Sequence, residues 1–193
     1  MISYQNGEPA QWGFMIDSLR EDSFRFIELL LDPKHHVSQI SKAALASIKL
    51  PGTMNKTVGD VATDYIRKIW NYTKEDIQKT LGDTWESLHT LRLVVTLPAN
   101  WPLEVNDIIL DAACKAGNQY MVQILTEPKA AALAVLQENE NLVLKTEDSF
   151  LVCHAGSTTV DLIGYKIVSL DLLAFVKCAP QSGKLYILPS HTQ

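Results

Sequence analysis

Residues 148–167, DSFLVCHAGSTTVDLIGYKI, are typical of a strand, a tight loop and a second strand. Four apolar residues at positions 150–153 lead into a short loop of Gly, Ser and Thr, and an alternating stretch follows it. A loop of this kind presents backbone N–H groups and hydroxyls at a strand end, where they can hold a phosphate. His154 stands where metal–phosphate chemistry would use a carboxylate. The stretch therefore leaves two alternatives, a loop that binds a nucleotide or the relic of one.

Strands and helices alternate along the chain before this stretch. We expect strands over residues 91–98 and 122–126, and helices over residues 103–117 and 128–139. Each helix has a proline at its start, where the missing N–H costs nothing. With the strand near residue 150, the order becomes strand, helix, strand, helix, strand, which indicates an α/β fold with a mixed sheet flanked by helices. The apolar strands predict that both faces of the sheet are covered.

Four segments outside this alternation carry further predictions. Residues 2–16 indicate two short strands around an Asn-Gly turn, and residues 18–33 indicate a helix that ends at a proline. The clearest helix follows Thr57, which opens a capping box with an aspartate three residues on, and its apolar side chains recur on one face. Beyond residue 177 the periodicity is lost, apart from a predicted strand at 184–188.

Composition limits the class of protein. At 193 residues the chain has room for one domain, or one and a fragment, and 47% hydrophobic residues suffice for a core. The net charge of −5 and the scattered basic residues argue against nucleic acid as a partner. No apolar run reaches the length of a membrane span, and the N-terminus has no signal-peptide pattern. The three cysteines form no CxxC pair, so we expect a cytoplasmic protein with inert thiols, two of them buried.

Two polar junctions are candidates for chemistry. Glu127 lies between a predicted strand and a predicted helix, and the loop at 156–159 follows another strand end. Ligands gather at strand ends in open α/β sheets, so Glu127 could orient a water or a hydrated magnesium while Thr159 and loop N–H groups hold phosphate. The alternative is that Glu127 only caps its helix electrostatically and the loop is a β-turn. A Cys153–His154 nucleophile–base pair is disfavoured, because adjacent strand residues point to opposite faces.

Several segments between Ile2 and Ile167 are similar to one known family. The chain resembles the nucleotide-binding domain of the 70-kDa heat-shock proteins, and most closely a divergent branch, common in fungi, that lacks the standard substrate-binding region. The segments that carry the resemblance occur in the family's order: ISYQNGEPAQWGF, FIELLLDP, TVGDVATDYIRKIW, VVTLPANWPLEVNDIILDAACKAG, LTEPKAAALAVL and DSFLVCHAGSTTVDLIGYKI.

The resemblance implies the actin-like ATPase fold, which is ribonuclease H-like, with ATP and magnesium held between two lobes. Residues 1–147 would form most of the first lobe, without its first phosphate loop, and residues 148–193 the truncated start of the second. By the same resemblance, Glu127 would lie on the water side of the γ-phosphate. Gly156 would let the backbone approach the phosphates, and Thr159 would offer them a hydroxyl.

The departures from the family pattern fall on the residues that handle phosphate and magnesium. By the resemblance, His154 replaces an aspartate that helps hold hydrated magnesium, and a neutral imidazole is a poor ligand for that cation. Ser157 and Thr158 replace two glycines and add Cβ atoms where the backbone turns against phosphate. Glu28 replaces a lysine that reaches the γ-phosphate, and Asn106 stands near an arginine that works with a switch proline, here Pro98.

These departures predict a degenerate nucleotide-binding domain. One stabilising cation can be worth 10³–10⁵ in the rate of phosphoryl transfer, so losing the lysine, the magnesium aspartate and the first loop should remove hydrolysis. We expect Glu127 to be vestigial and a protein that acts through contacts with protein partners or clients. One alternative is an ATP-binding, chaperone-like ATPase recorded as a fragment of a longer product. Another is a gene remnant of marginal stability.

Overall fold

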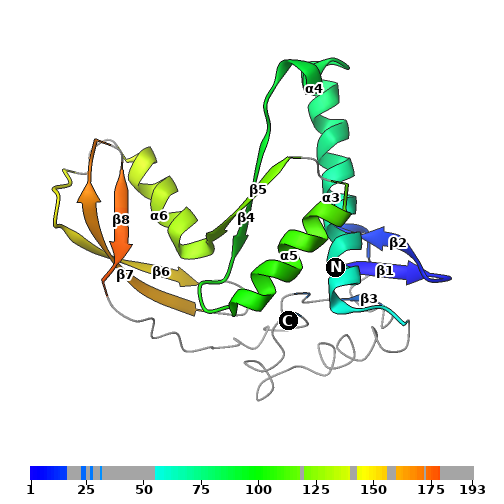
Figure 1. The fold of residues 1–193 in the computed structure, drawn as a ribbon, viewed down its shortest axis with the longest axis horizontal. Helices are drawn as coiled ribbons and strands as arrows, with labels where there is room; N and C mark the ends of the chain where they lie inside the picture. Colours follow the sequence, from blue (N-terminus) through cyan, green and yellow to red (C-terminus); the bar gives the residue numbers. More distant parts are fainter. Residues whose placement is uncertain are drawn as a thin grey trace, which may run out of the picture. The chain divides into compact units, whose positions relative to one another are not determined.

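A computed structural model describes residues 1–16, 23–24, 27, 31, 55–117, 120–139, 143–155, 160–171 and 173–178 (Figure 1). These residues form a mixed α/β structure with three small sheets, which agrees with the predicted α/β class. The chain divides into two compact units. The first contains Met1–Leu93 and Pro102–Gln123, and the second contains Val94–Trp101 and Ile124–Gln193.

The first unit begins with a three-stranded antiparallel sheet. Strands β1 (Ile2–Gln5) and β2 (Glu8–Trp12) form a hairpin, followed by the short helix η1 (Gly13–Met15). The turn residues Asn6 and Gly7 have φ angles of 53° and 83°, the left-handed backbone that an Asn-Gly hairpin turn requires. Strand β3 (Ser23–Phe24) pairs with the other edge of β1. The hairpin prediction is confirmed, whereas the predicted helix over residues 18–33 is wrong at β3, because pairing with β1 overrides local helical periodicity.

Helix α3 (Val58–Leu81) is the longest element of the first unit. The predicted capping box is present, since the Thr57 hydroxyl accepts from the Asp60 N–H at 3.1 Å and the Asp60 carboxylate accepts from the Thr57 N–H at 2.8 Å. The buried face of α3 packs against helix α5 (Leu103–Lys115), and Val61 joins the core of the first sheet. Trp70, on α3, and Trp85, which begins helix α4 (Trp85–Leu88), are both buried.

The strand and helix order predicted for residues 91–139 is confirmed. Strands β4 (Arg92–Leu97) and β5 (Met121–Thr126) form a two-stranded sheet, and α5 lies between them in the chain. Helix α6 (Glu127–Glu138) follows β5 directly and has Pro128 in its first turn. None of the described helices is long and apolar enough to cross a membrane.

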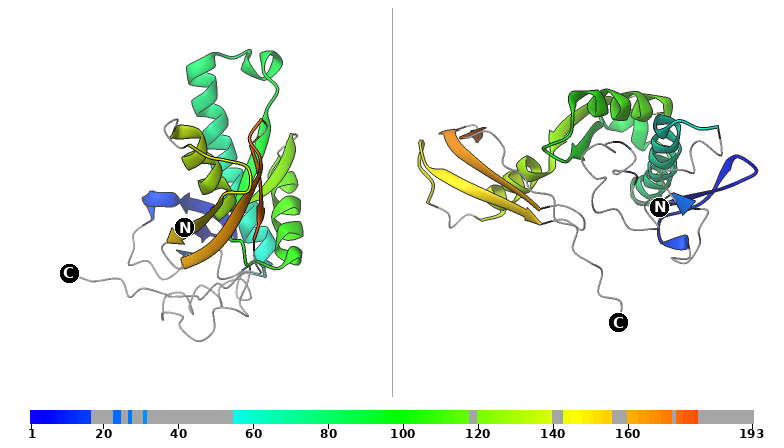
Figure 2. Two further views of the ribbon diagram at one scale, coloured as in Figure 1. Left: turned by 90° about the vertical axis from the view of Figure 1, so that its left-hand side faces the viewer. Right: turned by 90° about the horizontal axis from the view of Figure 1, so that it is seen from below.

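The second unit contains an antiparallel sheet of strands β6 (Ser149–Ala155), β7 (Val160–Ser169) and β8 (Ala174–Lys177), in that order. Figure 2 shows β6 and β7 as neighbouring strands over most of their length. Their inner face packs against α6 around a cluster of aromatic rings, with Tyr165 and Phe175 at 5.0 Å and Phe150 and Phe175 at 5.5 Å between ring centroids. The predicted strand–loop–strand arrangement of residues 148–167 is therefore confirmed at both strands.

The outer face of the β6–β7–β8 sheet differs from the prediction. Leu151 is 67% exposed, Leu162 44% and Val176 51%, so among the described residues only one face of the sheet is covered.

The thiols also differ from the prediction, because all three cysteines are exposed (Cys114, Cys153 and Cys178). The apolar run at 150–153 predicted burial on both sides, but alternation sends Leu151 and Cys153 to the outer face. The strand predicted at 184–188 lies outside the described residues.

Candidate functional site

Glu127 opens α6 at the end of β5, as the sequence predicted. Thr126 is the N-cap residue in extended conformation, and Glu127 is the acidic residue of the first turn. A negative charge at this position is stabilised by the partial positive charge of the helix N-terminus. The junction therefore places a half-exposed carboxylate beside the inner face of the β6–β7 hairpin, where it meets a second predicted site residue.

His154 lies against Glu127 in the second unit. The two are separated by 3.4 Å between His154 Nε2 and Glu127 Oε2, and their side chains are 29% and 31% exposed. His154 has the same strand parity as Phe150 and Val152, which pack into the core of this unit. Because alternate residues of a strand share a face, the imidazole lies on the face of β6 that packs against α6. The structure thus brings together the predicted vestigial carboxylate and the residue that replaces the family aspartate.

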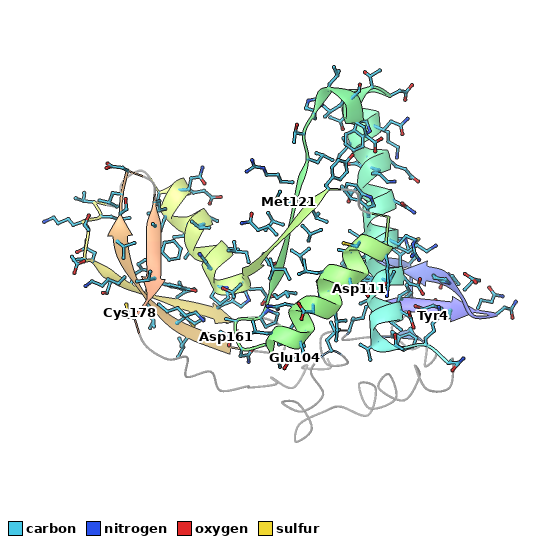
Figure 3. All side chains as sticks on the ribbon, in the orientation of Figure 1. Tyr4, Glu104, Asp111, Met121, Asp161 and Cys178 are labelled. Carbon is cyan, nitrogen blue, oxygen red and sulfur yellow. The ribbon has the colours of Figure 1, made fainter. Side chains whose placement is uncertain are left out.

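Asp161 is the third ionisable residue of this cluster, and it was not among the site residues predicted from the sequence. It is paired with His154 across β6 and β7, and it lies at the loop end of the hairpin (Figure 3). The side chain is 1% exposed, and its Oδ2 has no hydrogen-bond partner among the described residues. Burial raises the pKa of this carboxyl, and the charges of His154 and Lys177 oppose the rise. The sequence does contain a signal for the burial of Asp161. Side chains alternate between the two faces of a strand, so Asp161 lies on the same face as Ile163 and Tyr165.

Tyr165 adds a second buried polar atom on the inner face of β7. Its hydroxyl has no hydrogen-bond partner in the part of the chain that the structure describes. Burial raises the pKa of Tyr165, and the nearby Thr126 side chain opposes that rise. Within the described ranges, two polar atoms on the same face of one strand are therefore buried without partners, which is uncommon in a folded protein.

The predicted phosphate loop cannot be placed. Residues Gly156, Ser157, Thr158 and Thr159 lie outside the described residues, and so does Glu28. Pro98 directly follows β4, and Asn106 lies within α5 in the other unit. The site that the structure describes is therefore the Glu127–His154–Asp161 cluster, which we call the acid–histidine cluster.

The acid–histidine cluster does not fit a magnesium ion. Magnesium needs near-octahedral oxygen ligands and usually keeps several waters. Here one of the two carboxylates faces an imidazole and the other is buried. Across the described ranges, no three His, Cys, Asp or Glu side chains are arranged so that they could hold a metal ion.

A separate depression lies in the first unit, beside α3 and α4. Its volume is about 340 Å³, and it is lined by polar and charged side chains around a buried tryptophan (Asn71, Lys74, Glu75, Gln78, Asp83, Trp85 and Glu86). It contains none of the predicted site residues. The Gln78 amide donates to the Asp83 carboxylate at 2.6 Å, so part of this lining is already internally paired.

Comparison with known proteins returned neither a matching family model nor a matching curated protein. The likeness to the 70-kDa heat-shock proteins therefore rests on the sequence segments quoted above.

Proposed function

We propose that this protein is a degenerate nucleotide-binding domain of the 70-kDa heat-shock type that does not hydrolyse ATP and acts through contacts with other proteins. The observation that supports this most directly is the 3.4 Å approach of Glu127 and His154. The carboxylate that would orient a water or a hydrated magnesium instead faces an imidazole, and the same imidazole replaces the family's magnesium aspartate.

The chemistry of the pair explains why catalysis would be lost. A protonated imidazole draws the Glu127 carboxylate into a charge-assisted contact, and it repels a divalent cation. A neutral imidazole leaves a nitrogen donor where magnesium requires oxygen. In either protonation state, the position that would carry a metal–phosphate contact carries a side chain unsuited to it. Because a single stabilising cation is worth about 10³–10⁵ in rate, the change alone predicts loss of turnover.

The order of elements also supports the proposal. Strand β4, helix α5, strand β5, helix α6 and the β6–β7 hairpin follow one another in the order of the segments that resemble the family. Fold likeness does not determine function, so the site residues carry the functional assignment. Of these, Glu127 and His154 are described, and the expected roles of Glu28, Ser157 and Thr158 stay predictions.

Calorimetric titration with ATP and with ADP, each with and without magnesium, tests the proposal. We expect no magnesium-dependent binding at micromolar nucleotide from a protein that unfolds cooperatively. Magnesium-dependent micromolar binding would support the alternative, an ATP-binding chaperone-like ATPase, and would overturn the proposal.

Two variants sharpen this experiment. His154→Asp returns the family's carboxylate to the inner face of β6, and we expect any recovered nucleotide binding to require magnesium. Cys153→Asp is the matched control, because it adds the same charge one residue away on the exposed outer face. Equal recovery in both variants would show a general charge effect and would contradict the role assigned to position 154.

A further inference from the structure

The turn of the β1–β2 hairpin carries the one Asn-Gly pair in the sequence, Asn6-Gly7. Both residues are exposed, and Figure 1 shows the turn at the free tip of the hairpin. Gln5 and Glu8 form the last pair of the strand ladder, so the ladder does not include the Gly7 N–H. A Cβ atom at position 7 would meet nothing within 4 Å, so the space beside Gly7 is open. The Asn6 carboxamide and the main-chain nitrogen that follows it are therefore both accessible.

We propose that Asn6 is a site of spontaneous deamidation, which slowly converts this residue to aspartate and isoaspartate. The inference concerns the first unit and does not depend on the proposed loss of nucleotide hydrolysis.

The reaction needs only water besides the chain itself. The Gly7 nitrogen attacks the side-chain carbonyl carbon, Cγ, of Asn6 and loses its proton as the new C–N bond forms. The bond between Cγ and Nδ2 then breaks, and Nδ2 leaves with that proton as ammonia. Water opens the resulting cyclic imide at either carbonyl, which gives aspartate or isoaspartate, whose main chain runs through Cγ. One water is consumed for each ammonia released, and no group is oxidised or reduced.

The residue after each asparagine decides which one reacts. The attacking nitrogen must approach the preceding side chain, and a Cβ on its own residue hinders that approach, which Gly7 lacks. Asn55 is the comparison within the same chain, because it is also exposed and its φ is 52°, against 53° for Asn6. It is followed by Lys56, whose Nζ donates to Asp64 at 3.0 Å. The two asparagines thus share exposure and φ and differ in the residue that follows.

Isoaspartate alters the hairpin, whereas aspartate does not. A two-residue turn with positive φ at both positions accepts Asp-Gly as well as Asn-Gly. Isoaspartate adds a methylene to the main chain of the turn, and the length of the turn fixes the register of a hairpin. In the observed register Ile2 and Tyr4 are buried, and the Tyr4 hydroxyl donates to Asp64 at 2.9 Å. The isoaspartyl form should therefore loosen β1 from the core of the first unit.

Peptide mapping of the full-length chain during storage, in neutral and in mildly alkaline buffer, tests the site. We expect deamidated product at Asn6 well before any at Asn55. The conversion should be faster in the alkaline buffer, because the attacking nitrogen must lose its proton. Electron-transfer fragmentation distinguishes the aspartyl from the isoaspartyl peptide. Equal conversion at Asn6 and Asn55, or no conversion at Asn6 in either buffer, would overturn the proposal.

Hydrogen exchange before and after storage tests the effect on the hairpin. Asn6→Gly is the matched variant, because Gly-Gly also suits this turn but offers no side-chain amide. In the natural chain, the amides of β1 and β2 should lose protection in proportion to the isoaspartyl fraction, and in stored Asn6→Gly they should keep it. Equal losses in the two chains, or full protection in the isolated isoaspartyl form, would contradict the effect assigned to the turn. Neither measurement involves nucleotide, which the calorimetric experiment tests separately.

Discussion

Among the described residues, each unit buries one aspartate, and the two differ in how many partners their carboxylates have. In the first unit, Asp64 is 8% exposed and both of its oxygens are occupied. Its Oδ2 accepts from the Tyr4 hydroxyl at 2.9 Å and from Lys56 Nζ at 3.0 Å, and its Oδ1 accepts from Arg67 Nη1 at 2.9 Å. In the second unit, Asp161 is 1% exposed, and its Oδ2 has no partner among the residues that the structure describes.

The difference lies in how much of each buried charge is compensated. The Asp64 network joins β1 to α3, and Arg67 extends it to α5 by donating to the Lys115 carbonyl at 2.8 Å. Two cations and a hydroxyl compensate the buried charge, and burial together with the Asp64 hydrogen bond raises the pKa of Tyr4, which keeps its proton. Around Asp161 the charges of His154 and Lys177 compensate only in part, and burial still raises the pKa of this carboxyl. Perturbed and under-satisfied acids cluster at functional sites, which is why we place the function in the second unit.

The largest expected effect comes from breaking the satisfied network. Asp64→Asn removes the negative charge and leaves Lys56 and Arg67 facing a neutral amide, so we expect a loss of about 3 kcal/mol in the free energy of unfolding. Urea unfolding followed by far-UV circular dichroism should show a lower midpoint with an unchanged slope. The control is Asp107→Asn, an exposed aspartate on α5. If both variants lost the same stability, Asp64 would have no special structural role.

The corresponding change in the second unit should have the opposite sign. Asp161→Asn replaces a buried, under-satisfied carboxylate with a neutral group, so we expect a gain of about 1 kcal/mol at pH 8. Because burial raises the pKa of Asp161, the folded state holds its proton more tightly than the unfolded state. The cost of the ionised form is therefore absent at low pH and reaches its full value once pH exceeds the folded pKa. The gain should be largest above the folded pKa and should disappear well below it, and a loss of stability at pH 8 would contradict this account.

The smallest expected effect compares two buried tyrosines. Tyr4→Phe removes the hydroxyl that donates to Asp64, and we expect it to cost about 1 kcal/mol. Tyr165→Phe removes a hydroxyl that has no partner in the described ranges, so we expect no loss, or a slight gain. Hydrogen exchange of amides in β1 and β7 would show the two effects separately. Equal losses in both variants would mean that the Tyr165 hydroxyl is bonded in solution.

Short sequence motifs correctly predicted the turns and helix starts whose conformation depends only on neighbouring residues. The Asn-Gly turn, the Thr57 capping box and the proline at the start of α6 each determine backbone conformation within a few residues. Strand β3 was not predicted, because its cause is pairing with β1 rather than any nearby periodicity. Exposure of Cys153 was not predicted either, because it depends on what covers the outer face of the sheet and not on the strand itself.

The candidate site was only partly predictable for the same reason. The junction position of Glu127 could be read from the strand and helix pattern around it. Its contact with His154 could not, because it depends on how α6 packs on the hairpin. Asp161 could have been found from alternation alone, since an acid in phase with Ile163 and Tyr165 has to be buried.

The distribution of aromatic side chains gives each unit its own optical signal. Trp70 and Trp85 are buried in the first unit, and only Trp101 falls within the second. The core of the second unit is built instead on the edge-to-face and tilted rings of Phe150, Tyr165 and Phe175. Intrinsic tryptophan emission will therefore mainly report the melting of the first unit. Tyrosine signals arise in both units, because Tyr4 packs edge to face against Phe24 in the first. A loss of near-ultraviolet tyrosine dichroism without a change in tryptophan emission would therefore identify melting of the second unit alone.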